Sequence, residues 1–316
     1  MSRVIHTGQA LVDVVVEVPD LPDRGQNVMA ASATDYAGGT VTVLLAAARF
    51  GAECVQAGAI GTGPHGDLIR GALGAAGIGV SAPPVRDLDT GICVVMVEPS
   101  AERTFVTTLG AERRVSVDSL ATSDPRPGDL VCVTGFSLAL DSTRDPLLAW
   151  LPTLHPDVVV VLDPGAAFAG LDASVRAAML EVTDVWSSNA EEAADVLRAA
   201  GEDAPDDLTA LTVAVAPMLR GDAVAIVRDG PDGCAVHVAG RTTYVPGFPQ
   251  TPVDTNGAGD THTGALLAEV AAGTPWEEGC RRANAAAAIK VTRRGPESAP
   301  TAAEVDAFLS TADGPA

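Results

Sequence analysis

Short apolar segments alternate with Ala-rich stretches along the chain, and this alternation limits the fold more than any other feature. From residue 130 onward we expect strands at 130–134, 158–163, 185–187, 224–228 and 235–238, with helical stretches between them. Some of these runs are apolar throughout, which is typical of parallel strands buried on both faces. Aromatic residues make up only 3% of the chain, so Ala, Val and Leu must fill the core. The pattern predicts an α/β fold, a doubly wound and mostly parallel sheet with helices on both faces.

The first 110 residues predict further elements of the main domain and also a second, smaller β domain. Strands are expected at 4–8, 11–18 and 54–60, and helices at 41–50 and 66–76. Two further β segments, 92–98 and 104–108, surround a polar turn and indicate a small β-sheet appendage. We therefore expect residues 1–12, 38–90 and 112–311 to form the main α/β domain, which binds nucleotide and substrate, and residues 13–37 and 91–111 to form a β lid.

The net charge argues against two classes of partner, and the cysteines indicate the redox compartment. The formal net charge is −21, which would repel nucleic acid and anionic membranes, so neither is expected to bind. The five cysteines are widely spaced and form no CxxC or Cys/His cluster, which is typical of core residues in a reducing compartment. The first residues lack a basic leader pattern, and no later stretch approaches about 18 uninterrupted apolar residues. We expect a cytoplasmic protein.

The segment 254–261, with the sequence DTNGAGDT, carries the clearest chemical signal. It precedes an Ala/Leu-rich helix. Because Gly257, Ala258 and Gly259 lack bulky side chains, their N–H groups can point at an anionic group such as a phosphoryl in transfer. Asp260 follows directly and could accept a proton from an attacking hydroxyl. By residue type alone, a Gly-rich helix start with a capping Asp is an equal alternative.

The string DTNGAGDTHTG resembles the second signature of the ribokinase, or PfkB, family of carbohydrate kinases, and other stretches match the family in order along nearly the whole chain. The resemblance implies that Asp260 is the catalytic base and that residues 257–259 form the anion hole. Lys290 is the only lysine, and no GxxxxGK[ST] string is present, so a P-loop mechanism is excluded on the residues alone. Phosphate charge must then be met by Mg²⁺, backbone N–H groups and arginines.

The resemblance also assigns the acceptor site. It implies that Asp13 bonds substrate hydroxyls and that Gly38 and Gly39, before the helix at 41–50, contact the substrate. Thr42 and Leu11 stand where the family usually has Asn, so fewer sugar hydroxyls are expected to be bound. Without the resemblance, Asp13 is more simply a turn residue.

The stretch ERTF around Arg103 resembles the lid of many sugar kinases in this family. The resemblance implies a lid that closes over the substrate, with Arg103 as a substrate contact, and a homodimer formed through the lid. By residue type alone, Arg103 could equally be an exposed hairpin charge.

On the nucleotide side, the resemblance implies that Asn189 and Glu192 organise Mg²⁺ through water. It further implies ATP contacts, for which the candidate residues are Arg228, Gly230, Gly233 and Asn284. Some members of the family need a monovalent cation, so the resemblance also allows one such as K⁺ near Asp254 and Asn256, with oxygen atoms such as backbone carbonyls as its ligands. Residue types alone favour an N-cap at Asn189 and a simple hairpin turn at 230–233.

Together these features predict transfer of the γ-phosphoryl of Mg-ATP to a hydroxyl, expected to be a primary one, of a sugar or sugar-like small molecule. A nucleoside kinase of the same fold is the main alternative. A ligand-sensing relative with weak catalysis is a third.

Overall fold

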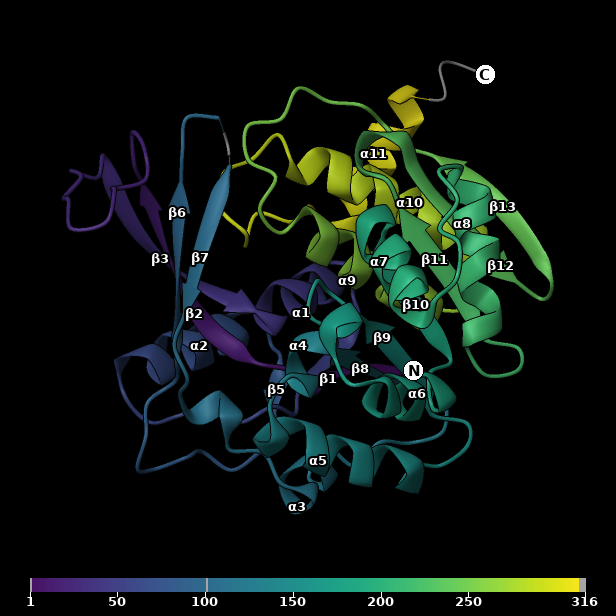
Figure 1. Cartoon of the computed structure of the whole chain (residues 1–316), viewed down its shortest axis with the longest axis horizontal. Coiled ribbons are helices and arrows are strands. Elements are labelled where there is room, and N and C mark those ends of the chain that lie inside the picture. Colours follow the sequence, from purple (N-terminus) through teal and green to yellow (C-terminus); the bar gives the residue numbers. More distant parts are fainter. Residues whose placement is uncertain (1, 101, 313–316) are drawn as a thin grey trace.

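The computed structural model describes residues 2–100 and 102–312, which form two β-sheets with helices packed around the larger one (Figure 1). The strands of the large sheet are β1 (Arg3–His6), β4 (Glu53–Gln56), β5 (Gly79–Val80), β8 (Leu130–Thr134), β9 (Val159–Asp163), β10 (Val185–Asn189), β11 (Val224–Arg228), β12 (Gly233–Val238) and β13 (Arg241–Pro246). The strands of the small sheet are β2 (Ala10–Glu17), β3 (Ser32–Gly39), β6 (Ile92–Val97) and β7 (Arg103–Thr107).

The large sheet has the order β13-β12-β11-β10-β9-β8-β1-β4-β5. Neighbouring strands from β11 to β5 are parallel, whereas β12 and β13 are antiparallel to their neighbours. The mostly parallel, doubly wound sheet is thus confirmed. The expectation that 235–238 follows the βα alternation is wrong, because the three-residue 3₁₀ turn Gly230–Asp232 is too short to carry a crossover helix. β13 was not expected.

Helices cover both faces of the large sheet. They are α1 (Thr40–Arg49), α2 (Pro64–Ala75), α3 (Val117–Ala121), α4 (Gly135–Leu138), α5 (Asp141–Trp150), α6 (Ala173–Glu181), α7 (Ala190–Ala200), α8 (Leu208–Val215), α9 (Ala258–Ala271), α10 (Trp276–Lys290) and α11 (Ala302–Ala312). Successive strand residues point to opposite faces, so Val4 joins the core beneath α1, α9 and α10 while Ile5 joins the core beneath α5 to α8. None of the described helices is both long and apolar enough to cross a bilayer.

The small sheet has the order β3-β2-β6-β7 and stands beside the large one, at the left of Figure 1. β2 and β3 form one antiparallel pair, β6 and β7 form another, and β2 and β6 join them in parallel. β3 was not predicted because Ser32–Gly39 is largely exposed and lacks the alternation of a half-buried strand. The division of the chain into lid and main domain at the residues given above stays a prediction.

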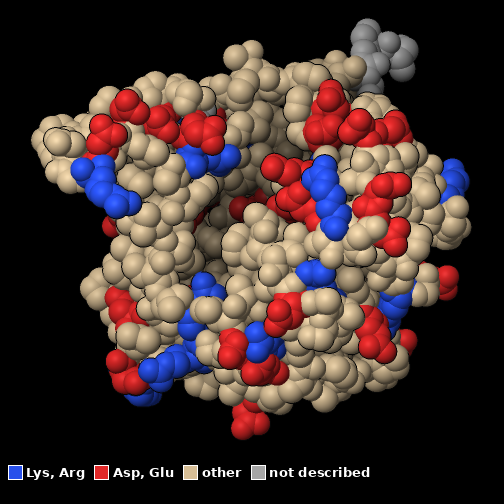
Figure 2. Space-filling model, in the orientation of Figure 1, with Lys and Arg blue, Asp and Glu red and all other residues tan. Residues whose placement is uncertain are grey.

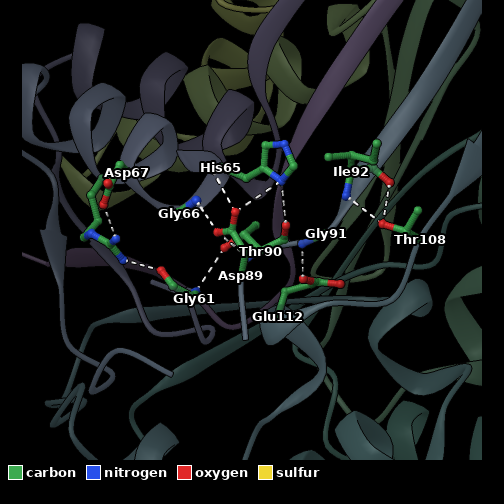
Figure 3. A network of polar contacts seen from close by, with 11 residues as sticks. Gly61, His65, Gly66, Asp67, Asp89, Thr90, Gly91, Ile92, Thr108 and Glu112 are labelled. Carbon is green, nitrogen blue, oxygen red and sulfur yellow. Dashed lines mark hydrogen bonds and ion pairs between the residues drawn. The ribbon is translucent and has the colours of Figure 1, made fainter. Parts of the chain in front are cut away.

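Two acids, the buried Glu112 and the half-buried Asp89, fix the point where β6 and β7 leave the main body (Figure 3). Glu112 is 1% exposed, and its two carboxylate oxygens accept the N–H groups of Gly91 and Gly110, each at 2.8 Å. Asp89 accepts the N–H groups of His65 and Gly66 at the start of α2, at 3.1 and 2.9 Å. These bonds satisfy backbone groups that no strand or helix partner reaches, and they tie both ends of the β6–β7 hairpin to the large-sheet side.

Candidate active site

The candidate site lies where the carboxyl ends of β9, β10 and β11 meet the start of α9 and the near end of the small sheet. In open parallel sheets this edge is the usual place for ligands. Figure 2 shows that this face is hollowed between the two sheets and that acidic atoms lie inside the hollow.

Gly257 forms the turn into α9 in a conformation that favours glycine. Its φ is 76°, and an added Cβ would lie 3.1 Å from Thr42 Cγ2 and 3.2 Å from Pro296 Cα. The Ala258 N–H closes the turn by donating to the Thr255 carbonyl at 3.2 Å. The first N–H groups of a helix lack intrahelical acceptors, so this turn offers donors and the positive end of the helix dipole to an anion.

Asp260 lies in the first turn of α9, directly beside these N–H groups. Burial raises the pKa of Asp260 to about 6, and the negative charges of Asp163 and Glu192 add to this rise while Arg228 and Lys290 oppose it. A carboxylate with a raised pKa is a stronger proton acceptor than an ordinary surface carboxylate. The side chain is therefore suited to act as a general base.

Arg228, at the end of β11, connects the groups around Asp260. Its guanidinium donates to the Ser188 carbonyl at 3.1 Å and to the Gly259 carbonyl at 3.0 Å, and it lies 3.5 Å from Asp163 Oδ2. An added Cβ at Gly259 would lie 2.9 Å from Arg228 Nη1. Arg228 thus holds the carbonyl side of the proposed anion hole and brings a positive charge to the nucleotide side of the hollow.

Asp13, on β2, lies against Gly38 on the neighbouring strand. An added Cβ at Gly38 would lie 2.2 Å from Asp13 Oδ2, so only glycine leaves room for the carboxylate. Burial raises the pKa of Asp13 to about 7, and the charge of Asp260 contributes to the rise. The structure therefore brings the acid of the small sheet close enough to the acid of α9 for the two charges to interact.

The other residues predicted at the acceptor side lie around the start of α1. Gly39 has a φ of 60° and an added Cβ there would meet the Gln9 carbonyl at 2.3 Å. Thr42 is 2% exposed and lies against Gly257. Leu11 packs with Cys93 and Val95 in a small apolar cluster, so its side chain serves the core of the small sheet.

Asn189 and Glu192 form a capping box at the start of α7. The Glu192 N–H donates to Asn189 Oδ1 at 2.7 Å, and the Asn189 N–H donates to Glu192 Oε2 at 3.0 Å. Burial raises the pKa of Glu192, and repulsion from Asp163 adds to this rise. Within the described residues, no three His, Cys, Asp or Glu side chains are grouped to hold a metal ion by themselves. Glu192 and Asp163 are close enough for their charges to interact. These acids suit a divalent cation that takes its remaining ligands from phosphate oxygens and water.

The remaining predicted nucleotide contacts lie at two places. Gly230 and Gly233 form the turn between β11 and β12, with φ angles of 50° and 105°. Asn284, on α10, is buried, and its amide donates to the carbonyls of Val245 and Pro246 and bonds His262, each at 3.1 Å. Its side chain therefore holds β13 against α9 and α10, and a direct contact with ATP stays a prediction.

Arg103 does not lie beside Asp13. In the register of the small sheet, Asp13 pairs with Cys93, and Cys93 pairs with Thr107. Arg103 pairs with Val97, at the opposite end of β7 from Thr107. Its guanidinium donates to Asn256 Oδ1 at 3.4 Å, and it lines a cavity of about 250 Å³ between the small sheet and the loops that precede α9 and follow α10. A substrate contact by Arg103 stays a prediction.

Lys290 and Asp163 are near the site, and sequence reasoning assigned neither a role. The Lys290 ammonium donates to the Asp254 carbonyl at 3.0 Å, at the place predicted for a monovalent cation. Burial raises the pKa of Asp163, and Arg228 opposes the rise. Asp163 ends the buried strand β9, and an acid at the carboxyl end of a parallel strand is the signal that could have identified it.

Residues 1–302 match the family model described as pfkB family carbohydrate kinase. The chain belongs to this family. A sugar kinase of Escherichia coli, YegV, is 29% identical to this chain over 305 residues, which cover 96% of this chain and 93% of the relative. An ATP-dependent ribose-1-phosphate kinase of Halopiger xanaduensis is 27% identical over 98% of this chain and 99% of its own length.

Solved structures agree with the family assignment. The ribokinase of Arabidopsis thaliana, solved in complex with ribose and ATP, is 26% identical to this pfkB member and superposes with a TM-score of 0.80 over 98% of this chain and 99% of the other. The chain is thus a carbohydrate kinase with the ribokinase fold.

Proposed function

We propose that this kinase transfers the γ-phosphoryl of ATP to a hydroxyl, most simply the primary hydroxyl, of a sugar with Asp260 as the base. Relatives that act on ribose 1-phosphate or bind ribose and ATP support a small sugar as acceptor and ATP as donor. The observation that carries the proposal is the proximity of two half-buried carboxylates from different parts of the fold, Asp13 on β2 and Asp260 on α9, beside the glycine turn at the start of α9.

In the proposed reaction, Asp13 accepts hydrogen bonds from sugar hydroxyls, and the glycines at 38 and 39 let the sugar approach the backbone. Asp260 takes the proton of the attacking hydroxyl as the sugar oxygen bonds the γ-phosphorus and the bond to the leaving ADP oxygen breaks. The N–H groups of Gly257 and Gly259 offset the negative charge on the phosphoryl in transfer, whereas the Ala258 N–H donates to the Thr255 carbonyl and holds the turn.

The nucleotide would lie along the carboxyl ends of β10 and β11, with its phosphates toward Arg228 and its base toward the Gly230–Gly233 turn and α10. Asn189 and Glu192 would hold Mg²⁺ through water, and the ion would supply positive charge to offset that of the phosphates. Burial is the main cause of the raised pKa of Glu192 and repulsion from Asp163 adds to it, and a cation at this place would relieve that repulsion.

The test is ADP release from Mg-ATP with single acceptors: ribose, ribose 1-phosphate, hexoses, sugar acids and ribonucleosides. We expect a sugar to stimulate turnover and Asp260→Asn to remove the stimulation, with a loss on the order of 10³-fold. Asp195→Asn, which changes an exposed acid on α7, is the matched control. Stimulation by nucleosides alone would favour the nucleoside kinase, and stimulation that survives in Asp260→Asn would refute the base.

We further propose that the protein forms a homodimer through the small sheet. β7 is an edge strand, and its Phe105 and Val106 side chains are each 55% exposed. Exposed apolar side chains on an unpaired edge strand favour contact with a second protein surface. Phe105→Ser with Val106→Thr should give a monomer by sedimentation velocity, and a monomeric parent protein would contradict the proposal.

A further inference from the structure

Lys290 is the last residue of α10, and its side chain is fully buried. It is the only lysine in the chain. A buried ammonium is costly unless its hydrogens have acceptors, because the low-polarity interior disfavours charge. The contacts of its Nζ atom therefore indicate what the group does.

Oxygen atoms surround the ammonium. It donates to the backbone carbonyls of Asp254 at 3.0 Å and Arg293 at 3.4 Å, and it lies 3.9 Å from Asp254 Oδ2. Burial lowers the pKa of Lys290 and the charge of Asp254 opposes this. Two carbonyls and a carboxylate are the kind of oxygen set that would otherwise bind a free monovalent cation.

These oxygens belong to the loop that precedes α9 and the loop that follows α10, which contact each other beside the Gly257 turn. Asp254 accepts the Asn256 N–H on Oδ1 at 2.8 Å and the Gly295 N–H on Oδ2 at 2.9 Å. Val253 and Asp254 donate to the Val291 carbonyl at 2.7 and 3.1 Å. One loop continues directly into Gly257, so the position of the anion hole depends on the Asp254 peptide that the ammonium holds.

The second loop also reaches the acceptor side. An added Cβ at Gly295 would lie 3.0 Å from Tyr36 Cε1, and Glu297 accepts the Ala37 N–H at 2.8 Å. Lys290 is thus at the junction of the turn beside Asp260 and the strand that carries Gly38. Its positive charge also opposes the rise in the pKa of Asp260 that burial causes.

The oxygens predicted from the sequence to bind K⁺ do not fit a free cation. The Asp254 carbonyl and carboxylate face the Lys290 ammonium, and Asn256 Oδ1 accepts from Arg103. We propose that the Lys290 ammonium is a covalently tethered cation that positions the catalytic loop, so this kinase works without a free monovalent cation.

The first measurement is the melting temperature, which needs no substrate. Unmodified protein is compared in potassium chloride and in tetramethylammonium chloride at equal ionic strength, and we expect a difference below about 1 °C. A cation that binds the folded state raises the melting temperature. A rise of several degrees in K⁺ would show that the unmodified protein binds K⁺ and would overturn the proposal.

The second measurement uses Lys290→Ala, which opens space for an ion, and Lys290→Met, which keeps the volume without the charge. In Lys290→Ala we expect K⁺ or ammonium to raise the melting temperature by about 3 °C or more, and Lys290→Met should not respond. Arg282→Met on the same helix removes ion pairs with Glu269 and Asp306 and is the control for a purely structural loss.

Activity gives the functional half of the test, which rests on the proposed function. We expect kcat of Lys290→Ala to fall about tenfold or more and to recover several-fold in K⁺, with no recovery in Arg282→Met. Wild-type activity that needs K⁺, or full activity of Lys290→Ala in every salt, would refute the proposal. If no sugar supports turnover, the melting temperatures still decide whether the ammonium replaces a free cation.

Discussion

The two sheets of this kinase differ in how deeply their strands are buried. β8 and β11 in the large sheet are covered by helices on both faces, whereas β3 and β7 in the small sheet are largely exposed. Strands covered on both faces hold their end residues in place more firmly than strands with one open face. The groups proposed to hold phosphate, which must be placed accurately, lie on this firmly packed side: Arg228 ends β11, and Gly257–Gly259 lie at the start of the helix α9.

The acceptor side takes its acid from the less buried sheet. Asp13 comes from β2, while Asp260 belongs to the helix layer on the large sheet. The candidate active site therefore joins a more buried side, here called the rigid half, and a more exposed side, here called the adaptable half, and the next four experiments test whether their functions separate in the same way.

Among these four experiments, the largest effect is expected from Gly257→Ala, which damages the rigid half. The substitution forces a left-handed φ on a side chain and pushes it toward Thr42 and Pro296. We expect kcat to fall on the order of 100-fold, with a small change in ATP binding measured by calorimetry. Gly273→Ala is the matched control, because Gly273 has a φ of 91° but open space around it. Equal loss of kcat in both variants would mean that backbone strain alone is responsible.

Gly38→Ala should damage the adaptable half. Its methyl group would displace the Asp13 carboxylate, so we expect KM for the sugar to rise about tenfold or more while KM for ATP stays the same. Gly71→Ala, on α2 with no atom within 4 Å of the added methyl, should leave both constants unchanged. A rise in KM for ATP would show that the two halves do not act separately.

The two acids should also separate in the pH dependence of kcat/KM. Both must be ionised to accept hydrogen bonds or a proton, and burial raises their pKa values to about 7 for Asp13 and about 6 for Asp260. We expect kcat/KM to begin falling below about pH 7 and to fall more steeply below about pH 6. A rate that stays flat to pH 5 would contradict both assignments.

The smallest effect is expected on stability. The folded-state pKa of Asp13 lies above its ordinary value of 3.8, so folded protein binds this proton more tightly than unfolded protein, and the carboxylate lowers stability as the pH rises from about 4 to about 7. Asp13→Asn should therefore raise the free energy of unfolding by about 1–2 kcal/mol at pH 8. Urea unfolding at pH 4.5 should show almost no gain, and an equal gain at both pH values would exclude this cause.

The sequence predicted the rigid half better than the adaptable half. β8 and β11 have the predicted ends, because a continuous apolar run marks a doubly buried strand clearly. β3 lacks such a signal, since Ser32–Gly39 is held mainly by pairing with β2 and by contacts such as the Ala37 bond to Glu297. The contact with Glu297 comes from 260 residues away, and neither composition nor alternation reveals it.

The candidate site shows a similar limit. Asp260 and the glycines around it are adjacent in the chain, so a short motif reveals them. Asp163 and Lys290 reach the same place from separate elements, and their relation to Asp260 depends on how the strands and helices pack. The sole lysine was conspicuous in the sequence, but its carbonyl partner at Asp254 is 36 residues away.

Each hairpin of the small sheet starts and ends at nearly the same place. Ala10 pairs with Gly39, and the Thr108 N–H donates to the Ile92 carbonyl at 2.9 Å. Either hairpin can therefore be lengthened, shortened or exchanged without threading a new chain through the large sheet. Because the proposed sugar contact Asp13 lies on this sheet and the proposed phosphate contacts lie elsewhere, changes in the hairpins should alter the choice of sugar and leave the phosphate chemistry unchanged.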